Sequence, residues 1–176
     1  MHNCDDLEQG VGQWAGRLVY HGTGTASAAD IVSNGISMKK SMLGYFGRGF
    51  YTADHEALAK SNYADMAAND GDEDGDGGPG VVLCFRIANT ARILDMRIPE
   101  DWETYNRLSN NGRLISNPSF DAIMRKSGVD GLFDRSFGGV VFYNPRALTL
   151  VQPQSDRDGL DAPEASSPQC LSRHKP

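Results

Sequence analysis

The sequence is poor in cysteine, and its cysteines are not arranged to bind a metal. Only three occur, at Cys4, Cys84 and Cys170. They form no Cys-x-x-Cys pair, and no His stands near them at ligand spacing. Neither a disulfide framework nor a structural zinc site is indicated, and we expect no metal. Cys84 falls inside an apparent strand, where a buried, unreactive thiol is expected.

Long hydrophobic runs are also missing. No apolar segment approaches the roughly 18 to 20 residues that a membrane span needs. Residues 1–10 lack the basic and apolar parts of a secretory signal. We therefore expect a soluble, intracellular protein, cytoplasmic or nuclear, with no membrane partner.

Basic residues are fewer than acidic residues. The chain has 17 Lys and Arg against 23 Asp and Glu, a formal net charge of −6, and shows no basic stripe. Phosphate neutralisation by basic residues dominates nucleic-acid binding. The balance therefore disfavours, without excluding, a nucleic-acid partner, and it argues against a reaction on an RNA phosphate.

The length of 176 residues and the 39% hydrophobic content fit a single globular domain. We expect an N-terminal segment over residues 1–14, a folded domain over 15–152 and a disordered tail over 153–176. Within the domain, residues 69–80 combine acidic residues and glycines without an apolar side chain. Such a composition predicts an acidic flexible loop.

Local patterns predict both strands and helices. The expected strands cover residues 17–20, 50–52, 81–87, 92–94, 140–143 and 147–151. The expected helices run from Thr25 to a stop at Gly35, from Asp54 to about Ala68, over 101–110, and through Phe120, Ile123 and Met124 to Gly128. Because these elements lack a regular βαβ rhythm, we expect an α+β fold with two small, mostly antiparallel sheets and flanking helices.

Two segments carry residues suited to a planar ligand. His21 follows the first expected strand and precedes Gly22, which sets an imidazole beside bare backbone. Further on, glycines surround Tyr45 and Phe46 in the expected loop 44–49, just before Tyr51. Aromatic rings can sandwich a planar cation such as nicotinamide, with about 0.5 to 2 kcal/mol from each ring.

Two other interpretations apply to the same residues. Tyr51 and Tyr63 fit equally well as core aromatics, although a core role does not account for the glycines. A phosphate loop is excluded, because residues 44–49 match neither GxxxxGK[ST] nor GxGxxG and lead into a strand.

Taken together, these segments resemble the donor site of the poly- and mono-ADP-ribosyltransferases of the diphtheria-toxin-like, His-Tyr-Glu type. The matching segments are Tyr20-His21-Gly22-Thr23, residues 31–36, residues 44–54 and Ser61-Asn62-Tyr63. The resemblance covers residues 17–65, with a looser similarity over 128–151. It implies an ADP-ribosyltransferase fold, like the catalytic domain of poly(ADP-ribose) polymerases, and NAD⁺ as co-substrate.

The first segment of the resemblance implies contacts to both ends of NAD⁺. His21 would hydrogen-bond the ribose hydroxyls of the adenosine side. Gly22 would hold the nicotinamide amide through backbone groups, and Thr23 would add a polar contact.

The second segment implies the walls of the nicotinamide site. Tyr51 would stack on nicotinamide, Tyr63 would close the other face, and Ser61 would lie near the amide. Lys60 falls near a lysine position of the poly-forming members, although the spacing differs by one residue.

This sequence departs from the family at the third motif, which contains the catalytic glutamate. Its glutamate, which stabilises the oxocarbenium-like ribose, would fall on Gly138 or Gly139. Poly(ADP-ribose) chain formation is therefore not expected. Asp134 is the candidate substitute for the glutamate, whereas Asp130, in Val-Asp-Gly, is interpreted as a turn residue.

We therefore expect an NAD⁺-dependent mono-ADP-ribosyltransferase that transfers ADP-ribose to a protein acceptor and releases nicotinamide. Its expected catalytic residues are His21, Tyr51 and Asp134. The alternative is a non-catalytic module of the same fold that binds NAD, ADP-ribose or a protein partner.

Overall fold

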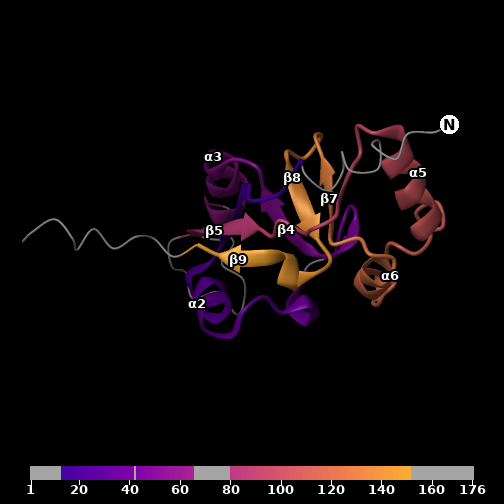
Figure 1. Ribbon diagram of the computed structural model, residues 1–176. Helices are drawn as coiled ribbons and strands as arrows, with labels where there is room; N and C mark the ends of the chain where they lie inside the picture. Colours follow the sequence, from indigo (N-terminus) through magenta and orange to yellow (C-terminus); the bar gives the residue numbers. More distant parts are fainter. Residues whose placement is uncertain (1–12, 42, 66–79, 152–176) are drawn as a thin grey trace, which may run out of the picture.

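A computed structural model of the chain describes residues 13–41, 43–65 and 80–151 (Figure 1). Apart from Gly80, the expected acidic loop 69–80 lies outside the described residues, as does the expected tail 153–176. At the other end, Trp14 is only 2% exposed and packs in the hydrophobic core. The folded domain therefore includes Trp14, which the expected boundary at residue 15 left out.

The described residues form both strands and helices, which alternate irregularly along the chain. The strands are β1 (Leu18–Thr23), β2 (Leu43–Gly44), β3 (Gly47–Arg48), β4 (Phe50–Ala53), β5 (Val81–Ile87), β6 (Ile93–Asp95), β7 (Gly131–Asp134), β8 (Gly139–Phe142) and β9 (Leu148–Leu150). The α-helices are α2 (Thr25–Asn34), α3 (Glu56–Ala59), α5 (Pro99–Leu108) and α6 (Phe120–Lys126). Short helices of other types are η2 (Met38–Lys40), η3 (Lys60–Ala64) and η4 (Pro145–Ala147).

Seven strands form one sheet in the order β6-β7-β8-β4-β1-β5-β9, and β2 and β3 form a separate small hairpin. Only the β6–β7 pair of the large sheet is parallel. The α+β class is thus as expected, but the expected pair of small sheets is wrong. The reason is the pairing of β4 with β8, which joins early and late strands into one sheet.

Two hydrophobic cores hold the helices. One contains Val19, Phe50 and Phe142, with Ile31 of α2 against it. The other contains Val141 together with Tyr105 of α5 and further side chains of α6. In Figure 1, α2 and α3 accordingly lie near β5 and β9, whereas α5 and α6 lie beyond β7.

Three local expectations need correction. The first strand does not end at Tyr20 but continues to Thr23, because β5 pairs with it at every residue. Residues 44–49 are not a loop: they form the β2–β3 hairpin. His55, not Asp54, is the N-cap of α3, which has a single turn and passes directly into the π-helix η3.

Strand β7 is an element that sequence patterns did not indicate. Its residues, Gly131–Asp134, lie outside all the strands and helices that the sequence predicts. They pair with β6 on one side and with β8 on the other. Asp134 is therefore the last residue of a strand inside the sheet and not part of a free loop.

The described residues contain no helix that is both long and apolar enough to cross a membrane. Within the same ranges, no three His, Cys, Asp or Glu side chains are grouped so that they could hold a metal ion.

Candidate functional site

The two segments with the family-like pattern meet at the centre of the sheet, where β1 and β4 are neighbours. The Nδ1 atom of His21 lies 2.8 Å from the backbone oxygen of Tyr51. Because a carbonyl oxygen only accepts, Nδ1 must carry the proton and donate it. In the neutral ring, Nε2 then has a free lone pair and is a hydrogen-bond acceptor.

Burial favours this neutral form of His21. Loss of solvent lowers the pKa of the imidazole, and the hydrogen bond to the Tyr51 carbonyl only partly opposes that shift. The ring also packs on Phe50, with the ring centroids 4.2 Å apart. At neutral pH the site therefore presents an oriented acceptor nitrogen and not a positive charge.

The Tyr51 side chain has a structural task of its own. Its hydroxyl accepts a hydrogen bond from the Phe46 backbone N–H (3.0 Å) and donates one to the Gly47 carbonyl (2.8 Å). An ideal Cβ at Gly44 would lie 2.4 Å from Tyr51 Cζ, so only glycine lets the ring approach this closely. The glycines thus allow a tyrosine to clamp the β2–β3 hairpin.

The rings of His21 on β1 and Tyr51 on β4 lie on different faces of the sheet. Successive strand residues point to opposite faces. His21 contacts Phe50, which is in the first core, whereas Tyr51 packs against the second core, with its ring centroid 6.0 Å from that of Phe137. The structure therefore joins His21 to the backbone of Tyr51 and directs the two side chains apart.

The remaining expected NAD contacts cluster around β1. Gly22 and Thr23 end β1 opposite Val82 and Val81 of β5, and η3, which contains Ser61 and Tyr63, packs against both strands. Ser61 is exposed, and its hydroxyl donates to Asn62 Oδ1 at 3.1 Å. The Tyr63 side chain lies outside what the structure describes. A π-helix is a frequent feature of functional sites.

Asp134 does not approach this cluster. It lies opposite Gly139 of β8, which in turn lies opposite Ala53 of β4. Two strand spacings separate Asp134 from β4, about 10 Å. Its Oδ1 atom also accepts hydrogen bonds from the backbone N–H and the hydroxyl of Ser136, which closes the turn between β7 and β8.

Asp130 has a structural role, as its sequence context indicated. Its carboxylate accepts hydrogen bonds from the Arg92 backbone N–H (2.9 Å) and from Asn144 Nδ2 (2.7 Å). These bonds tie the start of β6 and the end of β8 to the segment before β7.

The glycines at the expected glutamate position disfavour a side chain for different reasons. An ideal Cβ at Gly139 would lie 1.9 Å from the backbone oxygen of Thr52, so a glutamate is incompatible with the backbone there. Gly138 has φ +66°, where a glutamate would be strained, and a Cβ there would also lie 2.7 Å from Leu58 Cδ2.

Sequence reasoning missed a carboxylate that lies beside these glycines. The Oδ1 atom of Asp54 is buried without a hydrogen-bond partner among the described residues. It is 3.8 Å from the position that a Cβ of Gly138 would take and 3.9 Å from His55 Nε2. The only sign of it in the sequence is its place three residues after Tyr51, and the sequence pattern there predicts a helix start at Asp54.

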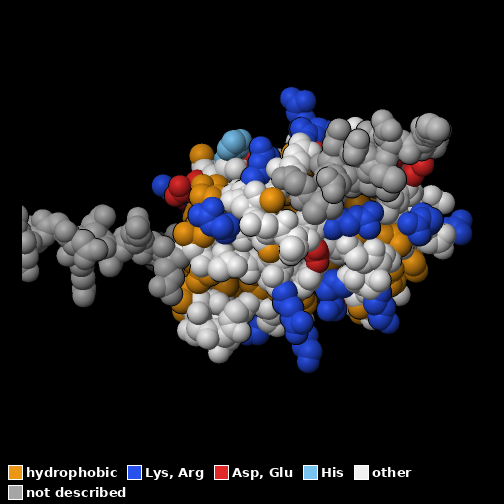
Figure 2. All heavy atoms as spheres, viewed as in Figure 1, with side chains coloured by type: hydrophobic (Ala, Val, Ile, Leu, Met, Phe, Trp, Pro, Cys, Tyr) orange, Lys and Arg blue, Asp and Glu red, His pale blue; other side chains and the backbone are white. Residues whose placement is uncertain are grey.

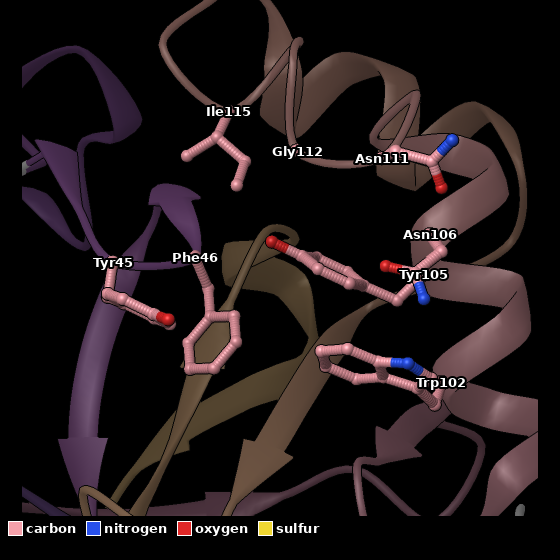
Figure 3. Close-up of a pocket in the computed structure, with 8 residues that line it drawn as sticks. All are labelled: Tyr45, Phe46, Trp102, Tyr105, Asn106, Asn111, Gly112 and Ile115. Carbon is pink, nitrogen blue, oxygen red and sulfur yellow. The ribbon is translucent and has the colours of Figure 1, made fainter.

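A separate pocket of about 280 Å³ lies between the β2–β3 hairpin and α5 (Figure 3). It is lined by Tyr45, Phe46, Trp102, Tyr105, Asn106, Asn111, Gly112 and Ile115. None of the expected NAD-contacting residues lines it. One of its sides is the hairpin that Tyr51 clamps.

Comparison with known proteins assigns no family to the chain. No protein-family model matches it, and no curated protein matches its sequence significantly.

Charged side chains are scattered over the face shown in Figure 2. Lys and Arg are more prominent there than Asp and Glu, and they stand in separate groups and not in one continuous area.

Proposed function

We propose that the protein is an NAD⁺-dependent mono-ADP-ribosyltransferase that acts on a protein acceptor. The observation that carries the proposal is the hydrogen bond from His21 Nδ1 to the Tyr51 carbonyl. It unites the two segments whose sequences resemble the family's donor site, and it leaves His21 Nε2 as an acceptor for a ribose hydroxyl.

The reaction needs a negative charge near the ribose carbon. The bond between C1′ and the nicotinamide nitrogen breaks, and its electron pair leaves with nicotinamide. A nucleophile of the acceptor then bonds to C1′ and releases to solvent any proton it carries. Carboxylates stabilise the positive charge that develops in between. Asp54 is proposed for this role in place of Asp134, because its Oδ1 is buried without a hydrogen bond among the described residues and lies beside Gly138, one of the two expected glutamate positions.

The test is incubation of the full chain with NAD⁺ labelled in the adenylate part, alone and with a cell lysate. Calorimetric NAD⁺ binding is measured on the same sample. We expect label on a protein acceptor and its loss in His21→Ala, with the fold of the variant checked by thermal unfolding. Transfer that survives His21→Ala would remove the assignment of the donor site to β1 and β4.

A second candidate is a non-catalytic module that binds NAD or ADP-ribose. It is favoured by the backbone around Gly138 and Gly139, which disfavours the family's glutamate. Binding by the wild-type protein without any transfer would select this function, and the absence of binding would reject both candidates.

A further inference from the structure

The aromatic pocket between the β2–β3 hairpin and α5 has no task in the proposed transferase reaction. Its outer walls are Tyr45 and Trp102, which are 84% and 46% exposed and stand on opposite sides of the pocket (Figure 3). Phe46 and Tyr105, each only 3% exposed, lie between them. Exposed aromatic side chains therefore stand at the rim of the pocket, and buried aromatic side chains form its floor.

A buried polar atom is left unsatisfied in the same place. The Tyr105 hydroxyl is buried without a hydrogen-bond partner among the described residues, and Figure 3 shows it directed toward the space between Phe46 and Ile115. An unpaired buried hydroxyl costs about 1 to 3 kcal/mol. A ligand with a polar edge would supply the missing partner.

The lining also limits the chemistry and the size of the ligand. No charged side chain lines the pocket, and its remaining polar side chains are the amides of Asn106 and Asn111. Amide groups pair with the donor and acceptor edge of a nucleobase. The volume of about 280 Å³ is at the low end of ligand pockets, which suits one ring system and not a whole dinucleotide.

The backbone on both sides of the pocket is held in place without a ligand. The Tyr143 hydroxyl donates to the Phe46 carbonyl at 2.9 Å, on the hairpin side. On the other side, Asn111 and Gly112 have φ values of 52° and 82°, so a tight left-handed turn fixes the loop after α5. A preformed site loses little conformational entropy on binding.

We propose that this pocket binds a single neutral nucleobase, which packs against the aromatic side chains between Tyr45 and Trp102 and hydrogen-bonds the Tyr105 hydroxyl. A purine is the best match to a site with several aromatic walls, because its stacking surface is the larger. The site is distinct from the proposed NAD⁺ site, and the inference does not depend on the transferase reaction.

The test uses the full chain titrated with adenosine and followed by calorimetry and by tryptophan fluorescence. Trp14 is buried and Trp102 is half exposed, so stacking should quench the Trp102 emission. We expect saturable binding that weakens by about tenfold or more in Trp102→Ala and in Tyr45→Ala, the usual effect of removing one stacking ring. Val32→Ala is the matched control, because Val32 is also an exposed hydrophobic residue but lies on α2.

Tyr105→Phe separates a binding role from a structural one. We expect it to weaken adenosine binding while leaving the unfolding temperature unchanged or higher, because it deletes only an unpaired hydroxyl.

Two results would overturn the proposal: no saturable adenosine binding, or binding unaffected by Trp102→Ala. A third would be equal or tighter binding of N-acetyltryptophanamide in the same assay. That outcome would identify the pocket as a site for an aromatic side chain of a protein partner.

Discussion

Three buried or half-buried tyrosines around the β2–β3 hairpin differ in one respect. The hydroxyls of Tyr51 and Tyr143 both bond the backbone of the hairpin, whereas the hydroxyl of Tyr105 bonds nothing among the described residues. The same chemical group is therefore stabilising at two positions and available for a ligand at the third.

This difference predicts opposite effects of the same mutation. Tyr143→Phe leaves the Phe46 carbonyl without its buried donor, so we expect a loss of about 1 to 3 kcal/mol in the free energy of unfolding. Tyr105→Phe is the matched control and should cause no loss. Urea unfolding of both variants measures the effect. Equal stabilities would contradict a stabilising role of the hydrogen bond from Tyr143 to Phe46.

The second prediction at this scale concerns the pH dependence of His21. Its pKa is lower in the folded than in the unfolded protein, so the unfolded chain binds the proton more readily. The stability contributed by neutral His21 is complete above the unfolded pKa of about 6.5. It is lost as the pH falls from there through the lowered folded pKa.

The affinity for NAD⁺ should depend on the protonation state of His21, because a proton on Nε2 removes the hydrogen-bond acceptor. We expect constant affinity from about pH 8 down to the ordinary histidine pKa of about 6.5, and weaker binding only below it. Calorimetric titrations across this range, with an NMR titration of the His21 ring, provide the measurement. A decline that begins above pH 7 would exclude His21 as the titrating group.

The carboxylates give a third comparison at the residue scale. We expect Asp54→Asn to reduce ADP-ribosyl transfer at least tenfold while NAD⁺ binding persists, because electrostatic stabilisation is commonly worth several kcal/mol. Asp134→Asn should have little effect, since Asp134 serves the turn with Ser136. The reverse order of effects would restore Asp134 as the catalytic candidate.

At the scale of the element, the start of β8 depends on the absence of side chains. Gly139→Ala would drive a methyl group into the backbone of β4 at Thr52, and we expect a loss of several kcal/mol of stability. Gly24→Ala is the matched control, because nothing lies within 4 Å of its added Cβ; it should cost about 1 kcal/mol or less. Thermal unfolding compares the two. A Gly139→Ala protein of normal stability would reopen that position to a glutamate.

Elements with a strong local pattern were predictable. The strand 81–87, the helix closed at Gly128 and the early strand–helix pair all occur near their expected places. β7 was not found, because Leu132 and Phe133 are its only apolar residues and look like part of a loop. β7 is stabilised by pairing with β6 and β8 on its two sides, and a local sequence pattern carries no information about such pairing.

The candidate site was predictable to a similar extent. The residues of β1 and β4 could be selected from their order in the chain, and the structure brings His21 to the Tyr51 backbone. The close approach of Gly139 to Thr52 and the burial of the Asp54 oxygen beside Gly138 depend on packing between distant segments. Such contacts have no signature in the sequence.

At the scale of the whole molecule, NAD⁺ binding should raise stability. A ligand that binds only the folded state adds about 2.7 kcal/mol when its concentration is 100 times the dissociation constant. We expect the unfolding temperature to rise with NAD⁺ concentration in the wild type and not in His21→Ala. A rise of equal size in the variant would show that NAD⁺ binds elsewhere.

The pairing of β4 with β8 also has a consequence for how the protein forms. The bond from Thr52 Oγ1 to the Val140 carbonyl spans 88 positions, and that from Tyr143 to Phe46 spans 97. Contacts this distant form slowly, because a long loop must close before they stabilise anything. During synthesis on the ribosome, β1 and β4 emerge first and must wait for β8. Until then the edge of β4 is unpaired and exposed to other chains, so this strand is where a chaperone would be needed most.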